Sequence, residues 1–391
     1  MFIIDILIYV FFALVMCNLA KKSYYYNNTN IDIYLWGYIC FFTLISAIRW
    51  GVGVDSISYA TEIMNGKTLY EILNNKDDPE ILMSCIIRTI HNLDLHFSFG
   101  LGLFAFIQMY FIVKSLKSHK YLLCTLPIIM FGSHYYLDLM NGVRQMTVAC
   151  VFLWSVKLIY ERKPIQYFVL IIATSFLHKS AVMLLPLYFI SKNINIANKR
   201  RLCMTIFLAC FIIGLSPQLK GFVDIIQKIA TLVGYSNYSE SISTYLDSSY
   251  TAETRALGPM QLSYLIIAIA SIWYGPKLHK YQSEIPYFNV WYLFSYVYIC
   301  LYFLFCNVSH ILLRPIDYFC LFHMIIVSLM LYDIMEKSKI NRKIGLLRTV
   351  LILIIWTNIS WSIIKSHYFL GEGEKEYTTY KVFFMHQDEI K

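Results

Sequence analysis

The chain is poor in charged residues. Asp, Glu, Lys and Arg make up only 15% of its 391 residues, whereas soluble domains usually carry about 25%. Instead, 58% of the residues are hydrophobic and 17% are aromatic. This composition excludes an ordinary soluble protein and predicts a polytopic membrane protein. The net charge of +9 is therefore no sign of nucleic-acid binding, and its meaning depends on where the positive residues lie.

Motifs of several common enzyme classes are also missing. The chain has no P-loop, GxGxxG, HExxH or GxSxG motif. Its ten cysteines form no CxxC pair and lie mostly in apolar runs, so we interpret them as small apolar side chains and not as a disulfide or zinc site. The N-terminus has no basic n-region and no small-residue cleavage site, so we expect its first apolar segment to be a retained helix.

Long apolar runs predict an all-α fold with about twelve transmembrane helices, each needing about 20 mostly apolar residues. The pair 164–177 and 180–191 is short, and forms either two helices that meet at a polar break or one long tilted span. Residues 80–94 predict an amphipathic helix on the membrane surface. The predicted spans are 2–20, 33–48, 97–116, 121–137, 143–160, 164–177, 180–191, 202–217, 260–276, 286–306, 316–333 and 346–364.

Basic residues alternate between successive connections, which predicts the orientation of the chain. Every second connection is basic and is therefore expected in the cytoplasm. Both termini then lie outside, provided that 164–191 makes two passes. The basic connections contain Lys21 and Lys22; Lys114, Lys117 and Lys120; Lys157, Arg162 and Lys163; Lys192, Lys199, Arg200 and Arg201; Lys277 and Lys280; and Lys337, Lys339, Arg342, Lys343 and Arg348.

The basic residues expected on the outer side lie at unusual positions, because Arg49, Arg144, Lys179 and Arg314 each mark the outer edge of a span. Charges at the membrane boundary are costly and often functional.

We expect a single membrane domain over the whole chain. Its outer parts are a segment at 49–96 with the amphipathic helix, a loop at 218–259 and a C-terminal tail at 365–391.

The stretch RWGVGVDSISY, residues 49–59, follows the second predicted span. Its two glycines permit a tight turn of the backbone. Arg49 is either a snorkelling residue or a ligand contact. Asp55 is either the N-cap of the next helix or a catalytic group, and Tyr59 lies one turn later on the same face.

The stretch SHYYLDLMNGVRQMTVA, residues 133–149, contains a polar stripe at helical spacing around a glycine. A polar turn between helices would explain the stripe without any function. A short outer turn rarely needs an arginine, however, so we favour a functional role for Arg144. The stripe consists of His134, Asp138, Asn141 and Gln145.

Two further polar stretches lie at outer boundaries. In FLHKSAVMLLPLY, a lone membrane histidine would more often be a packing residue, but Lys179 beside His178 gives catalysis equal weight. In LLRPIDYF, the proline places Arg314 at the start of a helix, and Asp317 and Tyr318 follow. We slightly favour a functional role for Arg314 over a helix-start ion pair.

Other signals are weaker. The sequence DDPE at 77–80 would offer carboxylates to a cation, but we favour a solvated turn before a helix. The tyrosine-rich outer loop would suit sugar stacking or the lipid headgroup level. The C-terminal tail offers no recognisable chemistry.

Several arginines on one side indicate an anionic ligand, because an arginine fork matches phosphate oxygens. Near the headgroups, such arginines would suit a lipid-linked diphosphate, and histidine, aspartate and tyrosine would suit a hydroxyl nucleophile or a sugar. Charge placement alone also fits a transporter, whose polar residues would lie nearer the membrane midplane.

The stretches RWGVGVDSISY, NGVRQMTVA and FLHKSAVMLLPLY, in this order, resemble the EpsG family of Wzy-like bacterial polysaccharide polymerases, which act on O-antigen of lipopolysaccharide or on capsule. LLRPIDYF resembles the family's late arginine segment, although Pro315 and Asp317 depart from it. The resemblance covers roughly residues 1–335. It implies an enzyme of the bacterial cytoplasmic (inner) membrane that joins polyprenyl-diphosphate-linked repeat units on the outer, periplasmic face.

On this resemblance, a repeat-unit hydroxyl attacks the anomeric carbon of the growing chain, and a lipid diphosphate leaves. His178 is the first candidate for general base, Asp55 the second and His134 the third. No metal and no cofactor are expected, since arginines take the cation's role. The expected partners are an undecaprenyl-diphosphate-linked oligosaccharide, membrane lipids and a chain-length regulator protein, but no nucleic acid. The expected substrate-binding residues are Arg49, Arg144, Gln145, Lys179, Arg314, Tyr59 and Tyr318.

Three alternatives have different signatures. A flippase or transporter of lipid-linked sugars predicts polar residues along a path through the membrane, whereas this sequence gathers them at one end. An O-antigen ligase-like transferase would normally have a large outer loop between late spans, and the loop at 218–259 does not decide. A membrane acyltransferase commonly has a histidine deep in the membrane, whereas His178 is expected at the outer edge.

Overall fold

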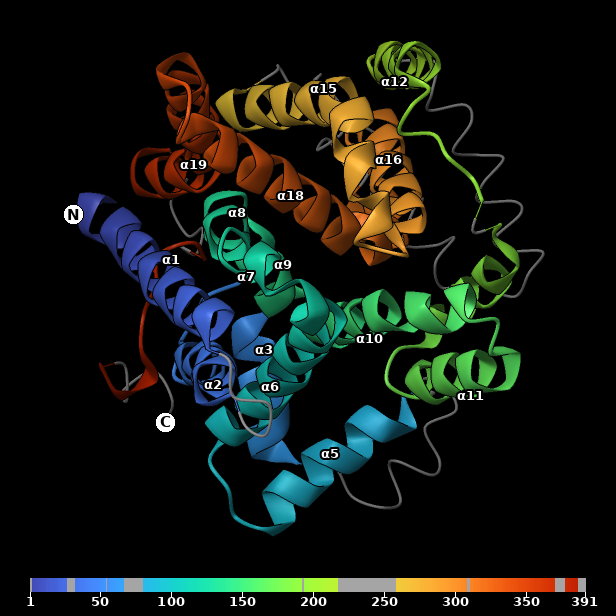
Figure 1. Ribbon diagram of the computed structural model, residues 1–391. Coiled ribbons are helices and arrows are strands. Elements are labelled where there is room, and N and C mark those ends of the chain that lie inside the picture. Colours follow the sequence, from blue (N-terminus) through green and yellow to red (C-terminus); the bar gives the residue numbers. More distant parts are fainter. Residues whose placement is uncertain are drawn as a thin grey trace.

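A computed structural model describes residues 2–26, 32–53, 55–66, 80–191, 193–216, 258–307, 310–369 and 377–385. Within these ranges the protein is helical, and its only extended pairing is one isolated bridge between Arg49 and Val382 (Figure 1). The expected all-α class is therefore confirmed. The predicted loop at 218–259 lies, except for its last two residues, outside the described residues.

Six stretches among the described residues are long and apolar enough to cross a membrane. This confirms a membrane-embedded helical protein, whereas the number of twelve spans and the outside location of both termini stay predictions. The six are α1 (Phe2–Tyr25), Phe97–Leu123, α10 (Val143–Tyr160), α16 (Phe288–Phe305), Asp317–Ser338 and α19 (Arg342–Tyr368).

The remaining elements are shorter or less apolar. Phe97–Leu123 joins α6 (Phe97–Leu116), η1 (Lys117–His119) and α7 (Lys120–Leu123), and Asp317–Ser338 joins η5 (Asp317–Phe319) and α18 (Cys320–Ser338). The others are α2 (Ile33–Ala47), α3 (Ser56–Asn65), α5 (Ile81–Asn92), α8 (Leu126–Gly132), α9 (Tyr135–Asn141), α11 (Pro164–Ser175), η2 (Lys179–Phe189), α12 (Arg200–Gly214), α15 (Pro259–Leu278), η4 (His279–Ser283), α17 (His310–Leu313) and η6 (Phe383–Met385).

One predicted span is broken in the structure, and the structure decides between the two alternatives left open at 164–191. The span expected at 121–137 is broken into α7, α8 and α9, and the second break lies at His134, whose backbone is left-handed with a φ of 71°. The pair expected at 164–191 forms two short helices. The Tyr167 hydroxyl donates to the Leu184 carbonyl at 2.6 Å, so α11 and η2 fold back on each other, and a single long span is excluded.

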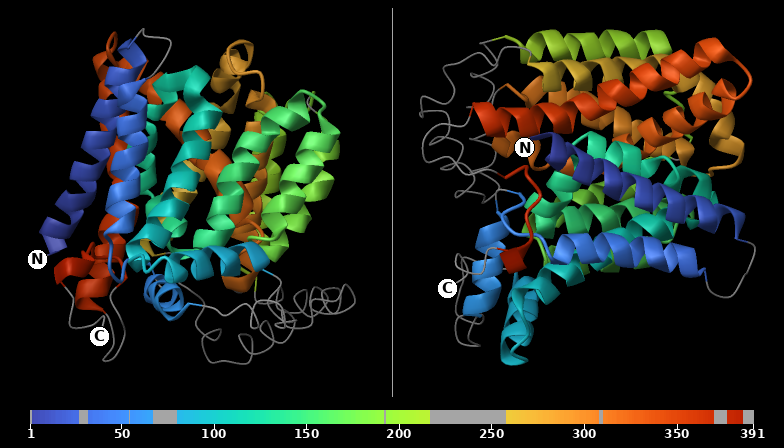
Figure 2. Two further views of the ribbon diagram at one scale, coloured as in Figure 1. Left: turned by 90° about the horizontal axis from the view of Figure 1, so that it is seen from below. Right: turned by 90° about the vertical axis from the view of Figure 1, so that its left-hand side faces the viewer.

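The amphipathic helix expected at 80–94 is α5. Its buried side chains Met83, Ile87 and Ile90 recur at helical spacing, whereas Ile81 and Leu82 on the other side are exposed. Figure 2 shows α5 lying across one end of the bundle, at a steep angle to the long helices. This placement brings the residue that precedes α5, Glu80, to the end of the bundle.

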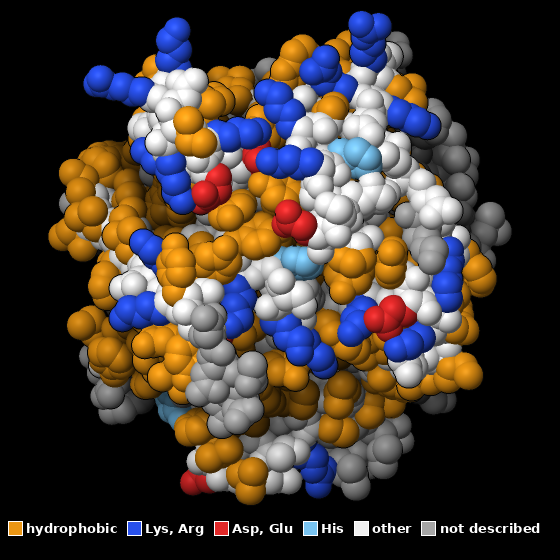
Figure 3. All heavy atoms as spheres, in the orientation of Figure 1, with side chains coloured by type: hydrophobic (Ala, Val, Ile, Leu, Met, Phe, Trp, Pro, Cys, Tyr) orange, Lys and Arg blue, Asp and Glu red, His pale blue; other side chains and the backbone are white. Residues whose placement is uncertain are grey.

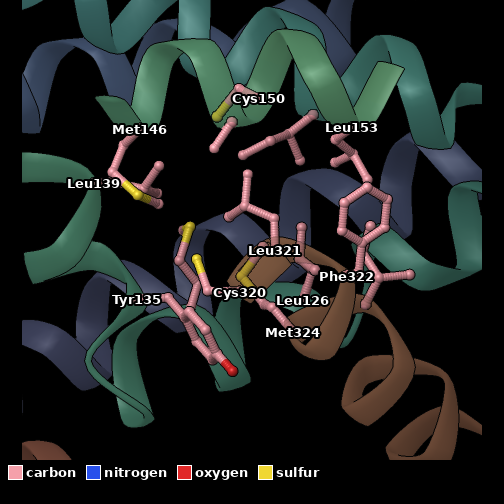
Figure 4. Close-up of a cluster of buried hydrophobic side chains, with 14 of the residues drawn as sticks. Leu126, Tyr135, Leu139, Met146, Cys150, Leu153, Cys320, Leu321, Phe322 and Met324 are labelled. Atoms are coloured by element: carbon pink, nitrogen blue, oxygen red, sulfur yellow. The ribbon is translucent and has the colours of Figure 1, made fainter. Parts of the chain in front are cut away.

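The centre of the bundle is mainly apolar and is built on α10 and α18. In the most apolar 18 residues of α10 and of Asp317–Ser338, which contains α18, 78% and 83% of the residues are buried. The corresponding share is 28% in α1 and in α19, which therefore lie at the periphery. Figure 4 shows the contact between α10, α18 and the α8–α9 segment. The labelled side chains are Leu126, Tyr135, Leu139, Met146, Cys150, Leu153, Cys320, Leu321, Phe322 and Met324, all of them buried.

One end of the bundle is rich in basic side chains. Figure 3 shows Lys and Arg side chains gathered on one end, which we call the basic end. There Lys120 binds Asp32 at 2.5 Å, and Lys280 and Lys337 bind Asp333 at 2.6 Å each. The opposite end, which we call the site end, carries α5 and the connections near residues 49–55, 141–145 and 176–180. The structure thus separates the basic connections from the polar stretches, as the alternation of charge predicts.

Candidate functional site

A polar cavity of about 180 Å³ lies at the site end. It brings together residues from all four polar stretches, although these are spread over more than half of the sequence. Most of its lining side chains carry a charge or a hydrogen-bonding group. They are Asp55, Tyr59, Asp138, Asn141, Gly142, Arg144, Gln145, Met146, His178, Arg314 and Asp317.

One carboxylate joins two of the predicted site residues. Glu80 binds the Arg144 guanidinium through one oxygen, and its Oε1 lies 2.6 Å from Nδ1 of His178. Glu80 is only 7% exposed, whereas Arg144 and His178 are half-buried and line the cavity. A buried carboxylate between two basic groups holds both in place and satisfies its own need for partners.

The sequence interpretation missed Glu80. We expected a solvated turn at 77–80, and for Glu80 that prediction is wrong because its side chain is buried. Asp77 and Asp78 lie outside the described residues. The available signal was the position of a carboxylate directly before an amphipathic helix at the membrane surface, where it meets arginines from neighbouring spans.

Local backbone structure presents the members of this group. His178 lies in the break between α11 and η2 with extended backbone, which turns its side chain out of both helices. The break is fixed to α5, because the Leu82 amide donates to the Phe176 carbonyl at 3.0 Å. Arg144 lies in the first turn of α10, and its guanidinium carbon is 5.6 Å from the centre of the Tyr59 ring.

Burial raises the pKa of the Tyr59 phenol, and the opposing effect of Arg144 is smaller. Tyr59 is therefore a neutral hydroxyl at physiological pH. It offers the cavity a donor and acceptor of hydrogen bonds but no charge.

Arg314 lines the cavity from the segment before η5 and is exposed. Its carbonyl accepts a hydrogen bond from the Gln145 side-chain amide, which ties the start of α10 to this segment. Tyr318 does not line the cavity. Its hydroxyl is hydrogen-bonded to that of Ser180 at 2.7 Å, so it links η5 to η2 beside the site.

The glycine-containing turn at 51–53 places Asp55 in the cavity. Gly51 and Gly53 have φ values of 65° and 89°, which strongly favour glycine. Asp55 occupies the N-cap position of α3, yet its side chain makes no capping hydrogen bond. Its backbone amide instead donates to Oδ1 of Asn141 at 3.0 Å, and its side chain lines the cavity. The Asp55 side chain therefore does not form the capping hydrogen bond that its position before α3 predicts.

Residues 377–385, which we call the C-terminal strap, bind the same turn. The Trp50 amide donates to the Lys381 carbonyl at 2.8 Å, and the Gly53 amide donates to the Tyr377 carbonyl at 3.0 Å. The Phe383 amide returns a bond to the Ile48 carbonyl at 3.0 Å. The strap belongs to the C-terminal tail, whose sequence offered no recognisable chemistry. It supports the turn that carries Asp55.

Besides Tyr318, three predicted site residues do not line the cavity. Arg49 is 1% exposed, and its guanidinium donates to the carbonyls of Ser46 and Met140. It therefore supports the cavity wall, because Met140 precedes Asn141. His134 is the N-cap residue of α9 and lies outside the lining, as does Lys179.

Asp138 and Asp317 add two carboxyl groups to the lining, and Asp138 was expected only as part of the polar stripe. Among the described residues, no group of three or more His, Cys, Asp or Glu side chains is arranged to hold a metal ion. The cavity therefore combines two arginines, a histidine held by a carboxylate, and three aspartates.

The model of the EpsG family matches residues 32–381, which is most of the chain. No curated protein and no solved structure matches significantly. The matched region contains every residue of the cavity, Glu80, and the strap as far as Lys381. The resemblance seen in the sequence is thereby confirmed, and the chain belongs to the EpsG family, a family of Wzy-like polysaccharide polymerases.

Proposed function

We propose that this protein is a glycosyltransferase that polymerises polyprenyl-diphosphate-linked oligosaccharide repeat units, and that the polar cavity is its active site. Membership of the EpsG family supports polysaccharide polymerase activity. The observation that carries the finer proposal is the convergence of Arg144, Arg314 and the Glu80-bound His178 on one cavity. We place this cavity on the outer face of the bacterial cytoplasmic membrane, because it lies opposite the basic end.

The proposed reaction exchanges one carbon–oxygen bond for another. A hydroxyl oxygen of one lipid-linked repeat unit attacks the anomeric carbon of the growing chain. The bond between that carbon and the diphosphate oxygen breaks, and the electron pair leaves with the lipid diphosphate. The hydroxyl proton passes to a base, so the reaction needs neither oxidant nor reductant.

Arg144 and Arg314 suit the diphosphate. Both line the cavity, and guanidinium groups bind phosphate oxygens through paired hydrogen bonds. Their charge would offset the negative charge that develops on the leaving group. The volume of 180 Å³ is below the about 300–1,000 Å³ of a typical small-molecule site, so it suits the diphosphate or the reacting sugar but not a whole repeat unit.

His178 suits the base. If Nδ1 donates its proton to Glu80, Nε2 has a free lone pair with which to accept the hydroxyl proton. The carboxylate would then stabilise the imidazolium that forms, as in other histidine–carboxylate pairs. Asp55 is the second candidate, because it lines the same cavity without capping α3.

A flippase or transporter is the second candidate, and the mainly apolar contact at the centre of the bundle speaks against it. The contact between α10, α18 and the α8–α9 segment contains Leu, Met, Phe and Cys side chains, whereas the cavity charges gather at one end (Figure 4). An O-antigen ligase-like transferase shares the proposed chemistry and differs only in its acceptor.

The test is reconstitution of purified protein with its lipid-linked repeat unit, in parallel with and without a divalent cation. We expect a ladder of polymer under both conditions. Movement of intact lipid between leaflets without any ladder would show a flippase instead. A ladder only with the cation would remove metal independence but keep the polymerase, and transfer to a lipid A acceptor alone would show a ligase.

A further inference from the structure

A second and larger cavity lies at the basic end, far from the polar cavity. It is a mainly apolar groove of about 990 Å³, bounded by α1, α7, α8, α18 and α19. These helices contact one another around it, and Figure 1 shows them on the same side of the bundle. None of its lining residues belongs to the polar cavity, so the proposed reaction does not account for it.

The groove follows one face of α1. Val10, Leu14, Cys17, Lys21 and Tyr25 recur at helical spacing and all line it. At about 1.5 Å per residue they cover about 22 Å along the helix axis. One leaflet contributes about 15 Å to the hydrocarbon core of a membrane, so the groove has room for an extended acyl chain and for part of a headgroup region.

The groove is open towards the membrane and closed inside the bundle. Leu14 and Leu353 line opposite walls, on α1 and α19, and each is 64% exposed. Towards the interior, α8 packs closely on α19 at Gly132, where a Cβ atom would lie 2.8 Å from Ile355. A molecule in the groove could therefore enter only from the basic end or sideways from the bilayer.

The chemistry changes along the groove. Its deep part is apolar, whereas its mouth at the basic end contains Lys21, Lys339 and four tyrosines: Tyr24, Tyr25, Tyr121 and Tyr332. Tyrosines prefer the headgroup level, and lysines there attract anionic lipid phosphates. Glu336 also lines the mouth and binds Lys339 at 2.6 Å, but both side chains are exposed, so a phosphate can compete for this lysine.

We propose that this groove binds an anionic glycerophospholipid, with one acyl chain along α1 and the phosphate between Lys21 and Lys339. The occupant is a lipid and not a soluble anion, because the polar mouth continues into an apolar groove. It is also separate from the polymerase substrate, whose diphosphate we place at the opposite end. A lipid here would fill the space between the two peripheral spans α1 and α19 and would stabilise their packing.

The test compares two lipids and two charge variants without any polymerase substrate, so its result does not depend on the proposed function. Delipidated protein in detergent is titrated with dioleoyl phosphatidylglycerol or dioleoyl phosphatidylcholine, while native mass spectrometry counts bound lipids and thermal unfolding is recorded. The variant Lys21→Gln/Lys339→Gln removes the charges at the mouth. Its matched control, Lys22→Gln/Lys343→Gln, removes the same charge from the same end but outside the groove.

We expect the wild-type protein and the control to bind one phosphatidylglycerol tightly and to unfold at a higher temperature with it than with phosphatidylcholine. The Lys21→Gln/Lys339→Gln variant should bind phosphatidylglycerol roughly 30-fold more weakly, from the usual contribution of two lysines near a headgroup. Leu14→Trp, which narrows the apolar part and keeps both lysines, should also weaken binding.

Equal binding of the two lipids by the wild-type protein would overturn the proposal. So would an equal loss in the control variant, because general surface charge would then explain the preference. A dimer that carries no lipid and is dissociated by Leu14→Trp would assign the groove to a second copy of the chain instead.

Discussion

Each end of the bundle contains a buried carboxylate with basic partners, and the two groups differ in whether those partners line a cavity. At the basic end, Asp333 accepts bonds from Lys280, Lys337, Tyr274 and Tyr281, at 2.6 to 3.0 Å. At the site end, Glu80 binds Arg144 and His178. Both carboxylates are at least nine-tenths buried.

The two groups differ in the surroundings of the side chains that bind each carboxylate. The Asp333 group fastens α15 and η4 to α18, and none of its members lines either cavity. The partners of Glu80, Arg144 and His178, both line the polar cavity, where their side chains can also contact a ligand. Similar chemistry thus fastens helices at one end and presents reactive groups at the other.

Arg144→Ala should give the largest effect on activity. It removes a positive charge that we place against the leaving diphosphate, and loss of one such group costs roughly 100-fold to 1,000-fold in rate. Polymer should disappear from the ladder assay while protein yield and the elution profile stay normal. Undiminished polymer would remove Arg144 from the active site.

Glu80→Gln should reduce polymerisation by roughly 10-fold to 100-fold, because the amide no longer neutralises Arg144 or stabilises a charged His178. The effects should overlap: in a His178→Ala background, the same change should cost much less than it does alone. The measurement is the initial polymerisation rate of the two single variants and the double variant. Fully additive losses would show that Glu80 does not act through His178.

Removal of the strap should have an intermediate effect. A chain ending at residue 376 loses the carbonyls that bind the Trp50 and Gly53 amides, so the turn that carries Asp55 is less well fixed. We expect a roughly 10-fold lower rate. A chain ending at Met385 keeps the whole strap and is the matched control; equal activity of the two would show that the strap does not position the site.

The sequence predicted most of the helices and the four polar stretches, because apolar length and charge are local properties. It predicted α6 and α10 to the residue and placed Arg144, His178 and Arg314 at one end. It could not identify Glu80, whose role depends on a contact with α10 and with the α11–η2 break, far along the chain.

Burial was equally hard to predict. Arg49 looks like a ligand contact from its neighbours in the sequence, but its guanidinium donates to backbone carbonyls inside the wall. The support of the turn at 51–53 by the strap joins residues more than 300 positions apart, through backbone groups that carry no sequence signature. Its role in catalysis stays a prediction.

Asp333→Asn should have the smallest effect on activity. It tests whether the carboxylate group at the basic end serves stability alone. The amide keeps the shape of the carboxylate but loses its charge, while Lys280 and Lys337 are exposed enough to turn towards water. The amide nitrogen cannot accept a hydrogen bond, so two of the four donors lose their acceptor, and stability should fall by about 1–3 kcal/mol, seen as a lower unfolding temperature. The polymerisation rate of the folded fraction should stay within about twofold of wild type, because the group touches neither cavity. A large loss of rate at unchanged stability would mean that this carboxylate also serves the reaction, and the distinction between a fastening end and a reactive end would fail.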